Sequence, residues 1–226
     1  MLTSVRAVVF DVGETLVDET RAWSEWADWL GVPRLTFLAV CGAVIERGGD
    51  HREPFEIFRP GLDLGEEVAK REAAGFPDRI TADDLYPDAA DCLRALRVAG
   101  YRIGVVGNQP ARAAAALADL GLPIDLLATS STWGVHKPDP RFFTRIAAEL
   151  DLPPTEIAYV GDRVDNDVQP AAAAGMQAVF LRRGPWAWIQ APADDPPQAT
   201  LTISSLAELP AAIAALNAAI PSWGDS

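Results

Sequence analysis

Hydrophobic positions divide most of the chain into short apolar runs alternating with longer segments of helical period. The runs are apolar on both faces, which is typical of buried parallel strands. They span residues 6–10, 102–106, 124–128, 157–160 and 178–181. A helical segment at residues 89–99 precedes the second run. The second run and each later run are followed by one helical segment, and these span residues 110–120, 140–150, 164–174 and 206–219. This alternation predicts an α/β fold with a parallel sheet and helices on both of its faces.

One block, residues 17–84, breaks the alternation. It contains four segments of helical pattern, and none is followed by a β-branched run. These segments span residues 20–30, 36–47, 53–58 and 62–74. We therefore expect a small all-helical domain inserted after residue 16, with residues 1–16 and 85–226 forming the α/β core. Trp23, Trp26 and Trp29 recur at a spacing that favours packing inside the insert, with a place at the active-site cleft as the alternative reading.

Residues 184–200 form a second irregular block. Four prolines interrupt it, and it carries two tryptophans, Trp186 and Trp188. Because proline is excluded from helix interiors and central strands, we expect a long surface loop.

The composition says little about the fold but limits the classes of molecule that the protein can bind. The chain has 226 residues, 49% of them hydrophobic, and a formal net charge of −13 without a clustered basic patch. That charge disfavours nucleic acid and anionic membranes as partners. No uninterrupted apolar stretch is long enough to span a bilayer, and Cys41 and Cys92 are too few and too far apart for a disulfide framework or a zinc site. We expect a cytoplasmic protein with reduced thiols.

Polar groups stand where the predicted strands end. Asp11 follows the first strand, Gly107-Asn108 the second, and Asp162 the run at 157–160, with Asp167 five residues later. Lys137 precedes the helix that begins at Pro140. In open α/β sheets the ligand crevice lies beyond the carboxyl ends of the strands, so these groups are candidates for one site.

This order of residues resembles the haloacid dehalogenase superfamily, whose motifs are DxDxT, a Thr or Ser after the second strand, a Lys, and GDxxxxD. The resemblance implies a Rossmann-like core, a helical cap over the site, and hydrolysis of phosphate esters through an aspartyl-phosphate intermediate. It assigns the nucleophile to Asp11, and Lys137 to pairing with Asp11 and the phosphate of a small phosphorylated substrate. It implies Mg²⁺ as the cofactor, bound by Asp11, the Gly13 carbonyl and Asp162 with support from Asp167, and oxygen ligands of this kind suit Mg²⁺.

Two positions depart from the phosphatase pattern. Gly13 stands where the second Asp of DxDxT would protonate the leaving group, and Gly107 stands where a Thr or Ser would bind phosphate. Loss of a general acid costs about 10²- to 10⁴-fold in rate, so turnover is expected to be slow unless Glu14 replaces the acid. Asn108 and backbone N–H groups remain as phosphate ligands.

Two alternatives follow from these departures. The 2-haloacid dehalogenases also lack the second Asp and work without a metal, although Asp162 and Asp167 argue against such a site here. A protein that keeps the fold without efficient turnover, and acts by binding, is the other alternative.

Overall fold

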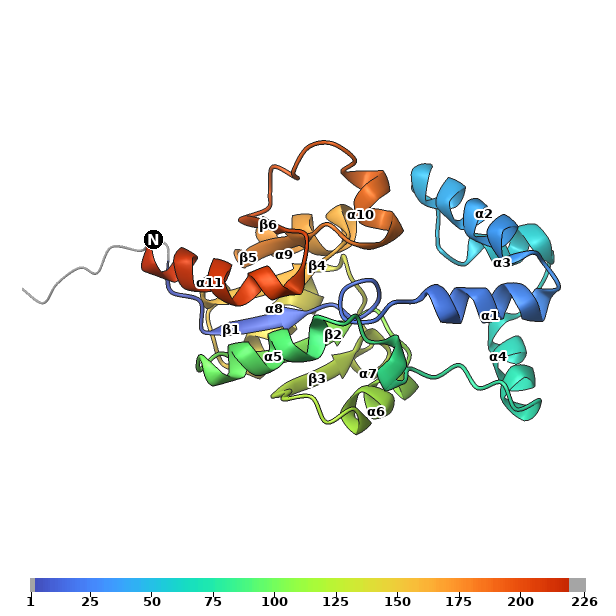
Figure 1. The fold of residues 1–226 in the computed structure, drawn as a ribbon, viewed down its shortest axis with the longest axis horizontal. Coiled ribbons are helices and arrows are strands. Elements are labelled where there is room, and N and C mark those ends of the chain that lie inside the picture. The colour runs from blue at the N-terminus through green and yellow to red at the C-terminus, as the bar shows by residue number, and fades with distance from the viewer. Residues whose placement is uncertain (1–2, 220–226) are drawn as a thin grey trace, which may run out of the picture.

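A six-stranded parallel sheet forms the centre of the molecule in the computed structural model, which describes residues 3–219 (Figure 1). Its strand order is β3-β2-β1-β4-β5-β6. The strands are β1 (Ala7–Phe10), β2 (Arg102–Gly107), β3 (Leu126–Thr129), β4 (Ile157–Gly161), β5 (Gln177–Leu181) and β6 (Leu201–Ile203). The predicted parallel sheet is confirmed. The edge strand β6 was not predicted, because three residues are too few to give a pattern.

Helices cover both faces of this sheet, which explains why the central strands are apolar throughout. Val8 and Phe10 of β1 pack with α5 (Ala89–Val98), α6 (Ala111–Asp119) and α11 (Leu209–Ala218). Ala7 and Val9 of the same strand pack on the opposite face. The helices on that face are α8 (Pro140–Leu150), α9 (Gln169–Ala173) and α10 (Gly184–Gln190). All four β1 residues are fully buried. The strand is therefore apolar on both faces because helices cover it from both sides.

The segment 17–84 is helical and has an apolar cluster of its own. It contains α1 (Thr20–Leu30), α2 (Arg34–Glu46), α3 (Glu53–Phe58) and α4 (Leu64–Ala73). Trp26, Phe37 and Phe55 are buried at the centre of this cluster, where Trp26 meets Phe55 edge to face with ring centroids 5.1 Å apart. We call this segment the helical insert. β1 points toward it, so it lies beyond the carboxyl ends of the strands (Figure 1).

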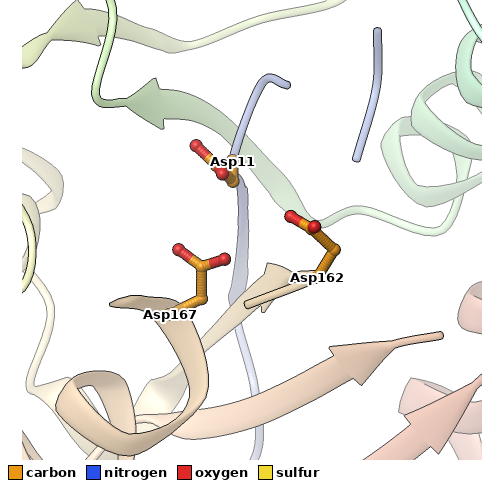
Figure 2. Close-up of side chains that lie close together, drawn as sticks. All are labelled: Asp11, Asp162 and Asp167. Carbon is orange, nitrogen blue, oxygen red and sulfur yellow. The ribbon is translucent and has the colours of Figure 1, made fainter. Parts of the chain in front are cut away.

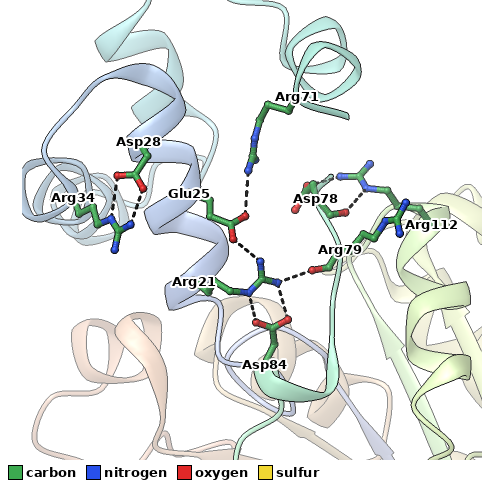
Figure 3. Close-up of polar contacts among 9 residues, drawn as sticks. All are labelled: Arg21, Glu25, Asp28, Arg34, Arg71, Asp78, Arg79, Asp84 and Arg112. Carbon is green, nitrogen blue, oxygen red and sulfur yellow. Dashed lines mark hydrogen bonds and ion pairs between the residues drawn. The ribbon is translucent and has the colours of Figure 1, made fainter. Parts of the chain in front are cut away.

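Two linkers join the helical insert to the sheet, and they pair with each other. The Asp18 amide donates to the Asp84 carbonyl at 2.8 Å, and the Tyr86 amide donates to the Leu16 carbonyl at 2.9 Å. Arg21, at the start of α1, also binds the second linker through two hydrogen bonds of 2.6 and 2.7 Å to the Asp84 carboxylate (Figure 3). Division of the chain into two domains at residues 17 and 84 stays a prediction.

A further ion pair connects the returning linker to the core. Arg112 of α6 donates to the Asp78 carboxylate at 2.6 Å (Figure 3). Both side chains are partly exposed to solvent, and exposed pairs of this kind stabilise a fold by at most about 1 kcal/mol. The contact is therefore weak enough to break if the helical insert moves.

The expected loop at 184–200 is partly wrong. Residues Gly184–Gln190 form the helix α10, with Pro185 in its first turn, and the irregular segment begins only after it. Proline is tolerated in the first helical turn because the amide it lacks would have no helical acceptor there. After the irregular segment, Leu201–Ile203 form the strand β6, which pairs in parallel with β5.

Within residues 3–219 no single helix is both long and apolar enough to cross a membrane, although α1 and α2 together, bent by 113°, reach the length and composition required. Cys92 is buried, Cys41 is half-buried, and both are free thiols.

Candidate active site

Three carboxylates meet at the carboxyl ends of two neighbouring strands. Asp11 directly follows β1, and Asp162 directly follows β4, which pairs with β1 in parallel register. Asp167 lies in the single helical turn Val164–Val168 that precedes α9. One oxygen from each of the three lies within 4.8 Å of the others, and Figure 2 shows the three side chains around one space. The sequence prediction that these residues share a site is consistent with this arrangement.

Lys137 lies between two of these carboxylates. Its Nζ is 2.8 Å from Asp11 Oδ1 and 2.5 Å from Asp167 Oδ1, and the side chain is almost completely buried. Asn108, at the end of β2, holds the backbone of this lysine: Lys137 N donates to Asn108 Oδ1 at 2.8 Å, and Asn108 Nδ2 donates to the Lys137 carbonyl at 3.0 Å. Asn108 thus positions the lysine loop. One hydrogen of the Asn108 side-chain amide is used in the bond to the Lys137 carbonyl, so the predicted contact of Asn108 with phosphate would use the other hydrogen.

Burial and neighbouring charges shift the pKa values of the buried groups at this site. Burial by itself lowers the pKa of Lys137, but the Asp11 and Asp167 carboxylates raise that pKa well above its ordinary value. Burial raises the pKa of Asp162 well above its usual range, and the negative charges of Asp167 and Asp11 add to that rise. The pKa of Asp167 is raised to about 6, chiefly by burial, and Lys137 limits the rise.

Asp162 and Asp167 differ in what their oxygens contact. Asp167 Oδ1 accepts from Lys137, and Oδ2 accepts from the Arg163 amide at 3.0 Å. Asp162 Oδ2, by contrast, is buried and has no hydrogen-bond partner. A buried oxygen that accepts no hydrogen bond lowers the stability of the fold by about 1–3 kcal/mol. A cation or another ligand bound to Asp162 Oδ2 would remove this cost. The oxygen donors Asp11 and Asp162 fit Mg²⁺, and Asp167 supports them through Lys137.

Two glycines allow the carboxylates to approach the strands. A Cβ atom at Gly107 would lie closer than 3.0 Å to Asp11 Oδ1, and one at Gly161 would lie equally close to the carboxylate of Asp167. Gly107 therefore leaves room for the Asp11 side chain. A Thr or Ser at position 107 would require the Asp11 carboxylate to shift from its place in this structure.

Glu14, the predicted substitute acid, lies in the linker to the helical insert. Its backbone has a positive φ of 53°, and the side chain is buried. Oε1 accepts from the Glu19 amide at 3.0 Å, and Oε2 accepts from the Tyr86 hydroxyl at 2.7 Å. Burial raises the pKa of Glu14, and these two hydrogen bonds lower it in part. Both oxygens thus join the two linkers, while a role of Glu14 in catalysis stays a prediction.

Glu19 is a site residue that the sequence reasoning did not find. It precedes α1, and its carboxyl group lies against Gly13, where a side chain at position 13 would point. Burial and the nearby Glu14 carboxylate raise its pKa to about 7, Asp11 adds to the rise, and hydrogen bonds from Trp23 and Gln109 oppose it. No motif marks this residue, because it is six positions from the glycine whose space it fills.

A cavity of about 250 Å³ opens beside Glu14, between the helical insert and α10. Its aromatic walls are Trp23 of α1 and Trp186 of α10, and His51 also lines it. The remaining wall is mostly apolar: Leu38, Cys41, Gly42, Ile45 and Pro185, with Thr20. Trp23 lines this cavity and also packs against the apolar cluster of the helical insert, in which Trp26 is buried as expected. A place of the tryptophans at the active-site cleft stays a prediction.

This site on a parallel α/β sheet is that of a hydrolase, and the chain belongs to the haloacid dehalogenase-like hydrolases, whose family model matches residues 5–175. It is 32% identical over 215 residues to the glyceraldehyde 3-phosphate phosphatase of Methanopyrus kandleri, a match that covers 84% of this chain and 90% of that protein. It is 30% identical over 210 residues to the phosphoglycolate phosphatase of Pseudomonas putida, covering 80% and 71%.

Dehalogenases are also among the similar proteins. The (S)-2-haloacid dehalogenase 4A of Burkholderia cepacia is 25% identical over 198 residues, covering 81% of this chain and 85% of that protein. Among solved structures, a phosphatase from Thermococcus onnurineus superposes with a TM-score of 0.61 at 24% identity, covering 92% of this chain and 98% of that one. A dehalogenase superposes with a TM-score of 0.65 at 22% identity, covering 92% and 97%. These two likenesses show the shared fold.

Proposed function

We propose that this protein is a Mg²⁺-dependent phosphohydrolase of small phosphorylated metabolites that works through an aspartyl-phosphate on Asp11. The observation that carries the proposal is the buried cluster of three carboxylates with Lys137 between two of them. The two relatives described above that match at 30% identity or more are named phosphatases, and they support a phosphate ester as the substrate.

Asp11 is the proposed nucleophile. Its carboxylate lies at the end of β1, where a ligand beyond the sheet edge can reach it. Lys137 orients Asp11 Oδ1 at 2.8 Å and brings a positive charge to the place where the phosphoryl oxygens would lie. Asn108 and Asp167 hold the backbone and the ammonium group of this lysine. These contacts fix the attacking oxygen and leave it little freedom to rotate.

Asp11, the Gly13 carbonyl and Asp162 would hold the metal, and Asp167 would support it through Lys137. The partnerless Asp162 Oδ2 favours this assignment over a metal-free dehalogenase, in which that buried oxygen would gain nothing. When bound, Mg²⁺ neutralises charge on the transferred phosphoryl group.

The size of the cleft limits the substrate. A cavity of about 250 Å³ lies below the roughly 300–1,000 Å³ of pockets for drug-sized ligands, so it suits the leaving group of a small metabolite. We infer that the helical insert acts as a lid over this cavity and excludes water from the site. A cytoplasmic location, and the absence of nucleic-acid and membrane partners, stay predictions from composition.

The test is hydrolysis of 4-nitrophenyl phosphate with MgCl₂ and with EDTA. This aryl ester has a leaving group that departs without an acid, so the assay tests Asp11 and the metal without requiring protonation of the leaving group. Activity should require MgCl₂ and should fall below detection in Asp11→Asn, with circular dichroism showing that the fold is kept. Activity that survives chelation would refute the metal assignment. Halide release from 2-chloropropionate would instead support a dehalogenase, and Mg²⁺ binding without turnover would support a binding protein.

A further inference from the structure

The space beside Gly13 holds a carboxyl group that comes from another residue. A Cβ atom built on Gly13 would lie 2.5 Å from Glu19 Oε1, 2.8 Å from its Cδ and 3.2 Å from its Oε2. In an aspartate, the carboxylate oxygens lie about 2.4 Å from the Cβ atom, as bond lengths require. Glu19 Oε1 therefore lies as far from that point as an oxygen of an aspartate at position 13 would.

The Glu19 carboxyl group is held in this place by both parts of the molecule. Its Oε2 accepts a hydrogen bond from the Trp23 indole, Nε1, at 3.2 Å, and Trp23 lies one turn further along α1. The Glu19 amide donates to Glu14 Oε1 at 3.0 Å, which fixes the backbone of the residue against the core. Oε1, the oxygen without the indole contact, is the one nearer to Gly13.

We propose that Glu19 is a catalytic residue of this enzyme and supplies the acid and base function that Gly13 cannot. The proposal rests on the phosphohydrolase function proposed above and assigns a residue to a step that the sequence motifs leave without one. Glu14, the carboxylate nearest in sequence, is a weaker candidate: the Glu19 amide and the Tyr86 hydroxyl bind its two oxygens, whereas Glu19 places its Oε1 in the space of the missing side chain at position 13.

The proposed reaction has two steps. First, an Asp11 oxygen forms a bond to phosphorus, the bond from phosphorus to the ester oxygen breaks, and the Glu19 carboxyl proton moves to that ester oxygen, so that a neutral alcohol leaves. Second, water attacks the aspartyl-phosphate, its proton moves to the Glu19 carboxylate, and the bond between phosphorus and Asp11 breaks. The sum is ester plus water giving alcohol plus phosphate, with both carboxyl groups restored.

Glu19→Gln tests this assignment, because it keeps the size and the acceptor oxygen of the side chain and removes the acidic proton. The probes are ethyl phosphate, whose alkoxide needs a proton, and 4-nitrophenyl phosphate, whose phenolate does not. For Glu19→Gln we expect kcat/KM to fall about 10²- to 10⁴-fold with the ethyl ester and less than about 10-fold with the aryl ester. The aspartyl-phosphate should also accumulate with the aryl ester, visible as an added phosphate by intact-protein mass spectrometry.

A second variant moves the carboxyl group back to the motif. Gly13→Asp combined with Glu19→Ala removes the glutamate and provides an aspartate in the same space, so it should restore the ratio of alkyl to aryl activity that Glu19→Ala loses. Glu25→Gln is the matched control. It is the same change in the adjacent helix α1, at a residue paired with Arg21 and Arg71 away from Gly13, and it should leave the ratio unchanged.

The outcomes separate the two proposals. If the wild-type protein does not hydrolyse the aryl ester, the phosphohydrolase proposal fails, and the role of Glu19 fails with it. If the wild-type protein is active but Glu19→Gln leaves the alkyl-to-aryl ratio unchanged, the role of Glu19 alone is refuted. A fall of the ratio in Glu19→Gln and its recovery in the double variant support Glu19.

Discussion

Replacing Asp162 with asparagine should stabilise the protein when no divalent cation is present. Asp162 Oδ2 is buried without a hydrogen-bond partner, and the negative charges of Asp167 and Asp11 lie close to it. An asparagine amide has nearly the same shape, carries no charge, and can donate to either neighbouring carboxylate. The variant therefore removes a repulsion in the folded state and can add a hydrogen bond, at the cost of a metal ligand.

The expected gain is about 1–3 kcal/mol, the cost of one buried polar atom left unsatisfied. With a urea m-value of about 3 kcal/mol per M, a gain of 2 kcal/mol moves the unfolding midpoint up by roughly 0.7 M. The gain should depend on pH, since burial raises the pKa of Asp162 in the folded state. Below about pH 4, Asp162 is protonated in the folded and the unfolded state, and the difference in stability between the variant and the wild type disappears. Above that pH, Asp162 ionises freely only in the unfolded state, which lowers the stability of the wild type. The variant is then the more stable protein.

The assay is urea unfolding of both proteins in EDTA and again in MgCl₂. A ligand at 100 times its Kd stabilises the folded state by about 2.7 kcal/mol, so the wild-type protein should gain stability with MgCl₂ and the Asp162→Asn variant should gain much less. Asp165→Asn, in the same turn, is the control, because Asp165 is paired with Arg163 at 2.8 Å and half-exposed. A variant Asp162→Asn that is less stable than the wild type in EDTA at pH 7 would refute the reasoning.

Two glycine substitutions test the close approaches at the site. Gly161→Ala places a Cβ against the Asp167 carboxylate, so we expect the free energy of unfolding in urea to fall by about 1–3 kcal/mol. Because Asp167 holds Lys137, aryl phosphate hydrolysis should also fall about 10²-fold. An unchanged free energy of unfolding would contradict this prediction. Gly107→Ser restores a hydroxyl of the phosphatase motif but displaces Asp11, so kcat for the aryl ester should fall, and a rise in kcat would show that the side chain is accommodated.

Much of the fold could be predicted because burial leaves a direct signal in the sequence. A strand covered on both faces must be apolar at every position, as β1 is, and the carboxyl ends of neighbouring parallel strands must meet at one edge. These two constraints place Asp11 and Asp162 at the same end of the sheet, and the structure adds that β1 and β4 are neighbours. Lys137 was found through the motif order, and the structure adds that Asn108 holds its loop.

The missed features had two causes, one local and one that depends on contacts between distant segments. The helix α10 was read as loop because of its prolines, although Pro185 lies in the first turn, where proline does not interrupt a helix. Trp186 and Trp23 line the same cavity although they lie far apart in sequence. No local pattern carries that information, because the pairing depends on how α10 is placed against the helical insert.

Glu19 shows the same limit at the level of chemistry, and it connects the site to the helical insert. A motif describes the residue at each position, whereas the reaction requires only that a carboxyl group lie within reach of the leaving oxygen. In this chain that group is attached to the linker that begins α1, and its second oxygen is bound by Trp23 of the same helix. A movement of α1 that carries residue 19 with it would therefore withdraw the carboxyl group from Gly13. If the helical insert is a lid, its closure brings Glu19 into the site, so the proton transfer that alkyl esters require becomes possible only when water is excluded.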